Sequence, residues 1–353
     1  MTIRQRLRFK IIRLLNYEFW PYYIFYFPML FYGLYLALRA KSLCYFSTTN
    51  PCMKYGGIMG ESKYKILKKI NPKWIPITLL IKKGLSFKEV VSILKGSKLS
   101  YPLIAKPDIG ERGIGVEMID DEKSLEKYFE QIQDDFIIQE FIGYENEIGV
   151  FYYRFPDKEK GNISSIVQKG FLYVTGDGTR TLEQLITNEL RAFSNLDYFK
   201  KKYSSRLGCI PEKGEKILLE PIGNHNRGTT FLNGERLINN KLIDQFDEIA
   251  KSITGFYYGR FDLKVKSIED LYEGKNLKIM ELNGVSSEPA HVYDPNYKLL
   301  KAYRDIAFQM KVIYRISEKN HRLGFKRDSF FQLLKDARHH LSESRKKRAA
   351  IQS

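Results

Sequence analysis

Apolar and polar positions alternate, or recur at helical spacing, along most of the chain between residues 61 and 320. Period-two or continuous apolar runs predict strands at 101–119 (two strands around a glycine-rich turn), 135–142, 147–155, 161–174, 257–265 and 278–283. Helical spacing, clearest where Leu125, Phe129 and Ile132 recur, predicts helices at 61–70, 121–132, 181–193, 240–254 and 296–316. Thr181 is the expected N-cap of the third of these helices. The mixture predicts an α+β fold, and no G-x-G-x-x-G opens a helix after a first strand, which argues against a dinucleotide-binding fold.

Two of the predicted strands carry charge inside apolar runs. Arg260 and Asp262 stand in "YYGRFDLKV", and Glu281 and Asn283 stand in "KIMELNG". Side chains two apart share one face of a strand, so each pair lies on a single face. If the two faces meet, two carboxylates and an amide oxygen converge, which are ligands that Mg²⁺ accepts. The pattern leaves two interpretations open: an ion-pair network neutralised by Arg260, or a metal site.

Three other stretches carry polar groups that could bind a nucleotide or a substrate. Lys106 ends a strand and precedes Gly110, Gly113 and Gly115, a spacing that lets backbone N–H groups approach phosphate. An apolar strand ends in a short hinge at 139–142 that could offer backbone groups to an adenine edge, and a carboxylate follows a few residues later. The loop 223–231 offers His225 or Arg227 to phosphate or substrate. Each stretch taken alone is also compatible with an ordinary solvated turn.

Taken in order, these stretches resemble the ATP-grasp superfamily, whose members include D-alanine:D-alanine ligase, glutathione synthetase and cyanophycin synthetase. The resemblance covers about residues 61 to 318, and its most specific part is R-x-D followed about twenty residues later by E-x-N. It implies two α+β lobes that grip ATP between them. It also implies a carboxylate–amine ligase that works through an acyl phosphate.

The resemblance assigns roles to individual residues. Asp262, Glu281 and Asn283 would hold two Mg²⁺ (or Mn²⁺) ions, and Arg260 and Lys106 would be catalytic. The nucleotide-binding positions would be Lys63, Lys106, Gly113, Gly115, Gln139, Glu140, Phe141, Ile142, Glu147 and Lys169, with Glu147 on the ribose.

The chain also departs from the family pattern. Residues 1–60 show no β-α-β pattern, and "GVSSEPAHVYDP" follows Asn283 where the ligases have a different turn. The acid and amine substrates therefore stay unidentified, with contacts expected at Arg227, Ser286, Ser287, Glu288 and His291. We expect an N-terminal arm and loop at 1–60, one lobe at 61–142, a second lobe with the metal site at 143–320, and a basic tail at 321–353.

Composition and charge are most informative about the two ends of the chain. The formal charge is +17, much of it in the first and last residues, and residues 19–38 carry no charge. That uncharged segment is compatible with a signal peptide, a transmembrane helix, an interfacial helix or hairpin, or an aromatic arm packed on the protein's own core. The flanking basic residues favour the cytoplasmic side of an anionic membrane. The three cysteines form no C-x-x-C pair, which favours the cytosol over an oxidising compartment.

These observations predict a cytoplasmic enzyme, or one peripheral at the inner face of the membrane, with small-molecule carboxylate and amine substrates. Nucleic acid is not an expected partner, and the oligomeric state is left open. A kinase of the same fold and a non-catalytic nucleotide-binding protein at a membrane surface are the alternatives.

Overall fold

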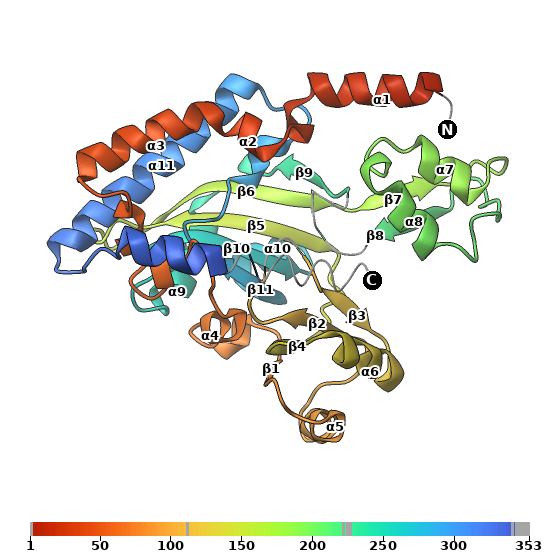
Figure 1. Cartoon of the computed structure of the whole chain (residues 1–353), viewed down its shortest axis with the longest axis horizontal. Coiled ribbons are helices and arrows are strands. Elements are labelled where there is room, and N and C mark those ends of the chain that lie inside the picture. Colours follow the sequence, from red (N-terminus) through yellow and green to blue (C-terminus); the bar gives the residue numbers. More distant parts are fainter. Residues whose placement is uncertain (1–2, 111–112, 221–222, 224–227, 340–341, 343–353) are drawn as a thin grey trace.

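A computed structural model describes residues 3–110, 113–220, 223, 228–339 and 342. These residues combine helices with three antiparallel sheets, so the predicted α+β class is confirmed (Figure 1). The two larger sheets and the helices of the N-terminal arm surround the site described below.

The smaller of these two sheets has four strands in the order β1-β4-β2-β3. Two helices pack on it, and their buried residues Val90, Leu94 and Leu125 share a core with Leu103 and Ile138 of the strands. The elements are β1 (Thr78–Ile81), α5 (Phe87–Lys95), β2 (Leu103–Pro107), β3 (Glu117–Ile119), α6 (Glu122–Gln131) and β4 (Phe136–Glu140).

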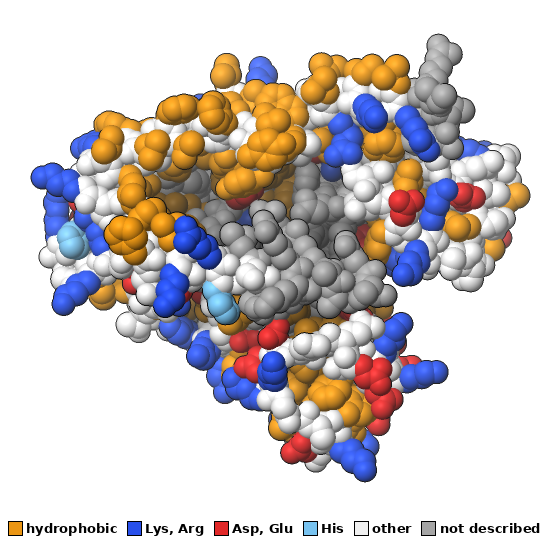
Figure 2. Space-filling view, in the orientation of Figure 1, with side chains coloured by type: hydrophobic (Ala, Val, Ile, Leu, Met, Phe, Trp, Pro, Cys, Tyr) orange, Lys and Arg blue, Asp and Glu red, His pale blue; other side chains and the backbone are white. Residues whose placement is uncertain are grey.

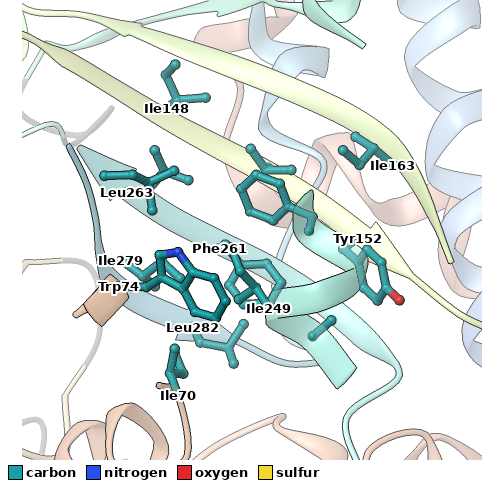
Figure 3. Packing of buried hydrophobic residues seen from close by; sticks show 14 of the residues in the cluster. Ile70, Trp74, Ile148, Tyr152, Ile163, Ile249, Phe261, Leu263, Ile279 and Leu282 are labelled. Carbon is teal, nitrogen blue, oxygen red and sulfur yellow. The ribbon is translucent and has the colours of Figure 1, made fainter. Parts of the chain in front are cut away.

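The larger sheet has five strands in the order β11-β10-β5-β6-β9. One face is covered by α9, α10 and α4, and the packed residues form the main hydrophobic core (Figure 3). The elements are α4 (Lys63–Leu67), β5 (Asn146–Tyr153), β6 (Asn162–Gly170), β9 (Thr230–Asn233), α9 (Asn240–Lys251), β10 (Tyr258–Val265), α10 (Ile268–Glu273) and β11 (Leu277–Asn283).

Alternation along β10 explains why an apolar strand carries charge. Phe261 and Leu263 point into the main core, together with Ile148 of β5 (Figure 3). Arg260 and Asp262 therefore project from the opposite face, because successive side chains of a strand alternate. The sheet separates a hydrophobic core on one side from a polar surface on the other.

A smaller unit lies beyond the large sheet (Figure 1). It pairs β7 (Leu172–Thr175) with β8 (Lys216–Glu220), and α7 (Leu182–Asn188) and α8 (Leu196–Lys202) share its core. Thr181 caps α7 as the sequence predicts, since its side chain accepts from the Gln184 N–H in a capping box.

The N-terminal segment folds as helices that lie on the rest of the chain. α1 (Ile3–Leu15) is followed by α2 (Tyr22–Phe25) and α3 (Phe27–Ala40), and α3 runs beside α11 (Leu299–Arg322) (Figure 1). We call residues 17–40 the aromatic arm. Its packing on α11 matches the interpretation of an arm on the protein's own core, and no described helix is both long and apolar enough to cross a membrane.

Polar contacts of Asn50 and Lys54 hold the segment between the aromatic arm and the small sheet. The Asn50 side chain accepts the N–H groups of Tyr257 and Tyr258 at 2.9 and 3.0 Å and donates to the Tyr258 and Gly56 carbonyls. Asp336, on a helix over 330–339, forms an ion pair with Lys54 at 2.6 Å. Within the basic tail predicted at 321–353, residues 330–339 therefore form a helix.

Candidate active site

A cavity of about 1710 Å³ lies between the small sheet, the polar face of the large sheet and the aromatic arm. It collects most of the residues that the sequence singled out, although they come from distant parts of the chain. Those lining it are Lys63, Lys106, Gly113, Gln139, Phe141, Ile142, Glu147, Lys169, Arg260, Asp262, Glu281, Asn283, Ser286, Ser287 and Glu288.

The charged positions of β10 and β11 meet across the two strands. The register places Asp262 opposite Glu281 and Arg260 opposite Asn283. The Arg260 guanidinium donates to both carboxylate oxygens of Asp262 at 2.9 Å, and the Asn283 amide donates to one of them at 3.2 Å. Burial would raise the pKa of Asp262, but Arg260 and then Lys169 outweigh it and hold that pKa below its ordinary value. Asp262 is therefore ionised.

Glu281 is held more loosely than Asp262. Its side chain is 35% exposed, and its ion-pair partner is Lys63 at 3.9 Å. The Lys63 ammonium also donates to the Gly110 carbonyl, which links the glycine-rich turn of the small lobe to β11. The Glu281 carboxylate is thus free to turn toward a cation in the cavity.

The donor set fits a hard cation that also binds substrate. The described residues contain no group of three or more His, Cys, Asp or Glu side chains placed to hold a metal ion by themselves. Mg²⁺ characteristically takes one or two carboxylates and completes its shell with water and phosphate oxygens. Asp262, Glu281 and the amide oxygen of Asn283 supply such a partial shell. The ion pair with Arg260 and a metal site are compatible, because Glu281 remains outside the pair.

Lys106 is buried at the floor of the cavity. Its ammonium donates to Gln139 Oε1 at 3.1 Å and to the Met280 carbonyl at 3.3 Å. That carbonyl is accessible because the β10–β11 register shifts between Asp262 and Leu263 and leaves Met280 without a partner. Burial lowers the pKa of Lys106 to about 8, although nearby carboxylates, Glu281 first, counteract it. The free protein thus holds a lysine that titrates near neutral pH.

A row of alternating charges crosses three strands beside Lys106. Glu147 is the register partner of both Lys169 and Lys264, and it forms an ion pair with Lys169 at 2.7 Å. Burial acts to lower the pKa of Lys169, but Glu147 and Asp262 together raise it above its ordinary value. Both Lys169 and Lys264 line the cavity.

Lys264 is a site residue that the sequence reasoning missed. Its ammonium donates to the Ile142 carbonyl at 3.0 Å and lies 5.4 Å from the centre of the Phe141 ring. Burial lowers its pKa. The signal was present, because Lys264 follows Arg260 and Asp262 at period two and so shares their face of β10.

Gln139 and Glu140, two residues of the hinge, form hydrogen bonds to other residues of the protein. The fully buried Gln139 accepts from Lys106 and donates to Thr78 at 3.0 Å, which orients the lysine. The Glu140 carboxylate accepts the Ile77 N–H at 3.1 Å, and Glu140 does not line the cavity. The other three hinge residues, Gln139, Phe141 and Ile142, line the cavity.

Two further positions named from the sequence, Gly115 and His291, lie elsewhere. Gly115 adopts a φ of 69°, its carbonyl accepts from Tyr128 at 2.9 Å, and it does not line the cavity. His291 is buried with its Nε2 3.3 Å from Asp305 and is also absent from the lining. His225 and Arg227 lie outside the described residues.

Comparison with known proteins finds a family model that matches part of the chain. Residues 63–154 match the family model described as a RimK-like ATP-grasp domain. That span contains the whole small sheet and β5, with Lys63, Lys106 and Glu147, and it ends before Arg260. None of the curated proteins matches the chain.

Solved structures with some similarity include three ligases or synthetases. D-alanine–D-alanine ligase from Bacillus anthracis is 16% identical with a TM-score of 0.41, over 74% of this chain and 67% of that chain. VanG D-Ala:D-Ser ligase from Enterococcus faecalis is 12% identical with a TM-score of 0.41, over 74% and 61%. A bifunctional glutathione synthetase from Pasteurella multocida is 14% identical with a TM-score of 0.38, over 70% of this chain but only 35% of that chain.

The match over residues 63–154 agrees with the resemblance that the sequence motifs carry, and the two sheets enclose the cavity as that resemblance implies. By this match, residues 63–154 are similar to a RimK-like ATP-grasp domain.

Proposed function

We propose that this protein is an ATP-dependent ligase that activates a carboxylate as an acyl phosphate and joins it to an amine. The observation that carries the proposal is the meeting, in one cavity, of several cationic side chains with the oxygen donors of β10 and β11. Phosphoryl transfer needs charge neutralisation and positioning more than covalent catalysis by the protein. The cavity offers both.

The nucleotide would lie between the two sheets. Phe141 and Ile142 would border the adenine, and Glu147 would accept from the ribose hydroxyls. Lys63, Lys106 and Lys169 line the same cavity, where they would contact the phosphates. Because Lys106 is buried, its charge acts in a medium of low dielectric constant and is worth more than an exposed charge.

Asp262, Glu281 and Asn283 would hold Mg²⁺, or Mn²⁺, against the phosphate oxygens. When bound, the cation neutralises phosphate charge that the lysines leave uncompensated. Arg260 has a second role because its Nη1 donates to the Glu288 carbonyl at 2.9 Å. That contact and the Asp262 pair hold its guanidinium in place, where it would stabilise an oxyanion at the acyl carbon.

The reaction balances without a nucleophilic side chain. A substrate carboxylate oxygen attacks the γ-phosphorus, and the bond from that phosphorus to the ADP oxygen breaks. The amine nitrogen then attacks the acyl carbon and expels inorganic phosphate, while the amine loses a proton to solvent. The net products are an amide, ADP and phosphate.

The test is ADP release by the purified full-length protein with Mg²⁺-ATP and pooled carboxylic acids and amines. Mass spectrometry of the mixtures should find a product lighter than its two substrates by one water. A product heavier by one phosphoryl group would instead identify a kinase of the same fold. ATP binding without turnover in any pool that contains both short and long-chain acids would favour a non-catalytic nucleotide-binding protein.

We also propose that α1 and α3 place the enzyme on the cytoplasmic face of an anionic membrane. Leu7, Ile11 and Leu14 recur at helical spacing on α1 and are exposed, beside the exposed basic residues Arg8 and Lys10. Exposed apolar side chains continue over the arm at Phe31, Tyr35 and Leu38. Figure 2 shows hydrophobic side chains gathered along the top of the molecule, over the N-terminal helices. A basic helix with an apolar face is typical of interfacial binding. The free cysteines Cys44, Cys52 and Cys209 suit the reducing compartment where ATP is available.

The double variant Phe31→Glu/Leu38→Glu should lose most binding to vesicles of phosphatidylserine and phosphatidylcholine. Each apolar side chain removed from the interface is worth about 1.5–3 kcal/mol, so for two of them we expect a loss of at least about 100-fold in partitioning. Sedimentation with vesicles at low and high salt measures it. The double variant Tyr173→Glu/Ile210→Glu, which changes exposed apolar residues of the β7–β8 unit, is the control and should bind normally. Equal sedimentation of both variants would contradict membrane docking by the arm.

A further inference from the structure

The cavity is larger than a nucleotide requires. Drug-sized ligands typically fill about 300–1,000 Å³, whereas this cavity measures about 1710 Å³. Lys106, Asp262 and their neighbours line one end, and Tyr23, Phe27, Leu30 and other residues of the aromatic arm line the continuation. Space for a second, extended ligand therefore leads from the charged end to an apolar wall.

The helix α3 is apolar around nearly its whole circumference, with Arg39 as its one charged residue. One side packs on α11, where Leu36 and Ala40 join the core and Gly33 lets the helices come close to Met310. A second side, which with Tyr23 of α2 comprises Phe27, Leu30 and Leu34, lines the cavity. We call these four residues the inner stripe.

The part of the chain that the structure describes leaves the inner stripe exposed. Tyr23, Phe27, Leu30 and Leu34 are each about half exposed or more, although they line a cavity that also reaches buried charges. Apolar side chains in that position are typical of ligand pockets, whose walls are apolar with a few polar groups that orient the ligand. From Phe27 to Leu34 the helix rises about 10 Å, enough to contact an extended chain along its length.

Direct contacts connect the arm to the catalytic arginine. The Phe25 ring lies 5.6 Å from the Tyr293 ring, and the Tyr293 hydroxyl donates to the Glu288 carboxylate at 2.7 Å. The Glu288 carbonyl accepts from Arg260, which pairs with Asp262. The loop 285–290 therefore forms the boundary between the apolar wall and the phosphate-facing residues.

We propose that the ligated substrate is an amphiphile, with an apolar chain lying along the inner stripe and a polar reacting group at Arg260 and the loop 285–290. This inference rests on the proposed function, because it names the substrate class for the same site. In this chain the aromatic arm supplies the apolar wall of the substrate site. A short, fully polar substrate would leave the inner stripe in water.

Tryptophan fluorescence can report on binding at the apolar wall of the cavity. It has two tryptophans, of which Trp20 lines the cavity and Trp74 is buried in the main core. A bromine atom quenches tryptophan fluorescence only on contact. Titration of the full-length protein with 12-bromododecanoate should therefore quench Trp20 and saturate, whereas 4-bromobutanoate at equal concentration should not. Trp20→Phe should abolish the quenching.

Two substitutions on α3 separate the cavity from the outer surface. Leu34 belongs to the inner stripe and is 46% exposed, whereas Leu38 does not line the cavity and is 79% exposed. Leu34→Asp should raise the 12-bromododecanoate concentration needed for half-quenching by at least about tenfold, because a buried leucine contributes about 1.5–3 kcal/mol. Leu38→Asp should leave it unchanged. Circular dichroism and ATP binding verify that both variants fold.

The outcomes separate this inference from the proposed function. Chain-length-dependent quenching that Leu34→Asp weakens and Leu38→Asp does not supports the amphiphile site, whether or not ATP turnover is found. Equal quenching by the two bromoacids, or equal weakening by the two variants, overturns it even if Mg²⁺-dependent ATP turnover is normal. Quenching without any ATP binding would keep the apolar site and refute the ligase.

Discussion

Replacing Glu281 with glutamine is expected to lower Mg²⁺-dependent ADP release by about 100- to 1,000-fold, a loss typical of removing one preorganised electrostatic contact. The melting temperature should change little. Glu281 is 35% exposed and its ion pair with Lys63 spans 3.9 Å, so the fold draws little stability from its charge. The substitution removes a carboxylate that would bind the cation but preserves the size of the side chain.

Asp262→Asn provides a contrast on the facing strand. Asp262 accepts two hydrogen bonds from Arg260, so the asparagine leaves a guanidinium largely buried without its counter-charge. Breaking a buried pair from one side costs about 3–5 kcal/mol, and we expect this variant to lose both stability and turnover. Glu281→Gln should lose turnover alone.

The measurement is ADP release as a function of Mg²⁺ concentration, combined with thermal unfolding of each variant. Glu248→Gln, which removes an exposed carboxylate of α9, is the control and should match the wild type. A Glu281→Gln enzyme with the wild-type rate and Mg²⁺ dependence would remove Glu281 from the proposed metal site. Raising the Mg²⁺ concentration should restore part of the lost activity if binding, rather than folding, is affected.

The meeting of the β10 and β11 faces illustrates what period-two alternation can predict. Arg260, Asp262, Glu281 and Asn283 were placed on two faces from spacing alone, and the register puts them opposite one another. Helix α9 and the Thr181 cap followed from apolar spacing and capping chemistry in the same way. Helix α5 was missed even though Ser86 and Glu89 form a capping box before its apolar positions, so that signal was available.

Other features depend on contacts that no local pattern contains. The Met280 carbonyl reaches Lys106 only because the strand register shifts, and a register shift belongs to the pairing of two strands. The arm packs on α11, which lies far away in the chain, so its sequence left several membrane and non-membrane interpretations open. The roles of Gln139 and Glu140 were also hidden, since Lys106 lies on the neighbouring strand β2 and Ile77 lies just before β1.

Lys106→Met is expected to weaken ATP binding by about 10- to 150-fold, because a hydrogen bond to a charged group is worth about 1.5–3 kcal/mol. Methionine preserves the length and apolar stem of the lysine and removes its charge. Equilibrium binding of Mg²⁺-ATP measures the loss. The control is Lys127→Met, which removes an exposed charge of α6 in the same lobe and should bind ATP normally.

The same lysine should make ATP binding depend on pH. Burial lowers its pKa to about 8 in the free protein, and the phosphates favour the protonated form. Affinity should therefore be nearly constant below about pH 8 and fall as the pH rises above it, by up to about tenfold per pH unit. The Lys106→Met variant should lack this decline.

Stability should move in the opposite direction. The folded-state pKa of Lys106 lies below its ordinary value of 10.5, so between about pH 8 and 10.5 the unfolded chain binds more protons than the folded one. The free energy of unfolding of the ATP-free wild type should rise across that window, relative to Lys106→Met, by about 3 kcal/mol. Denaturant unfolding of both proteins at several pH values measures the difference. A constant difference would mean that Lys106 does not titrate in this range, and the pH dependence of ATP binding would then need another group.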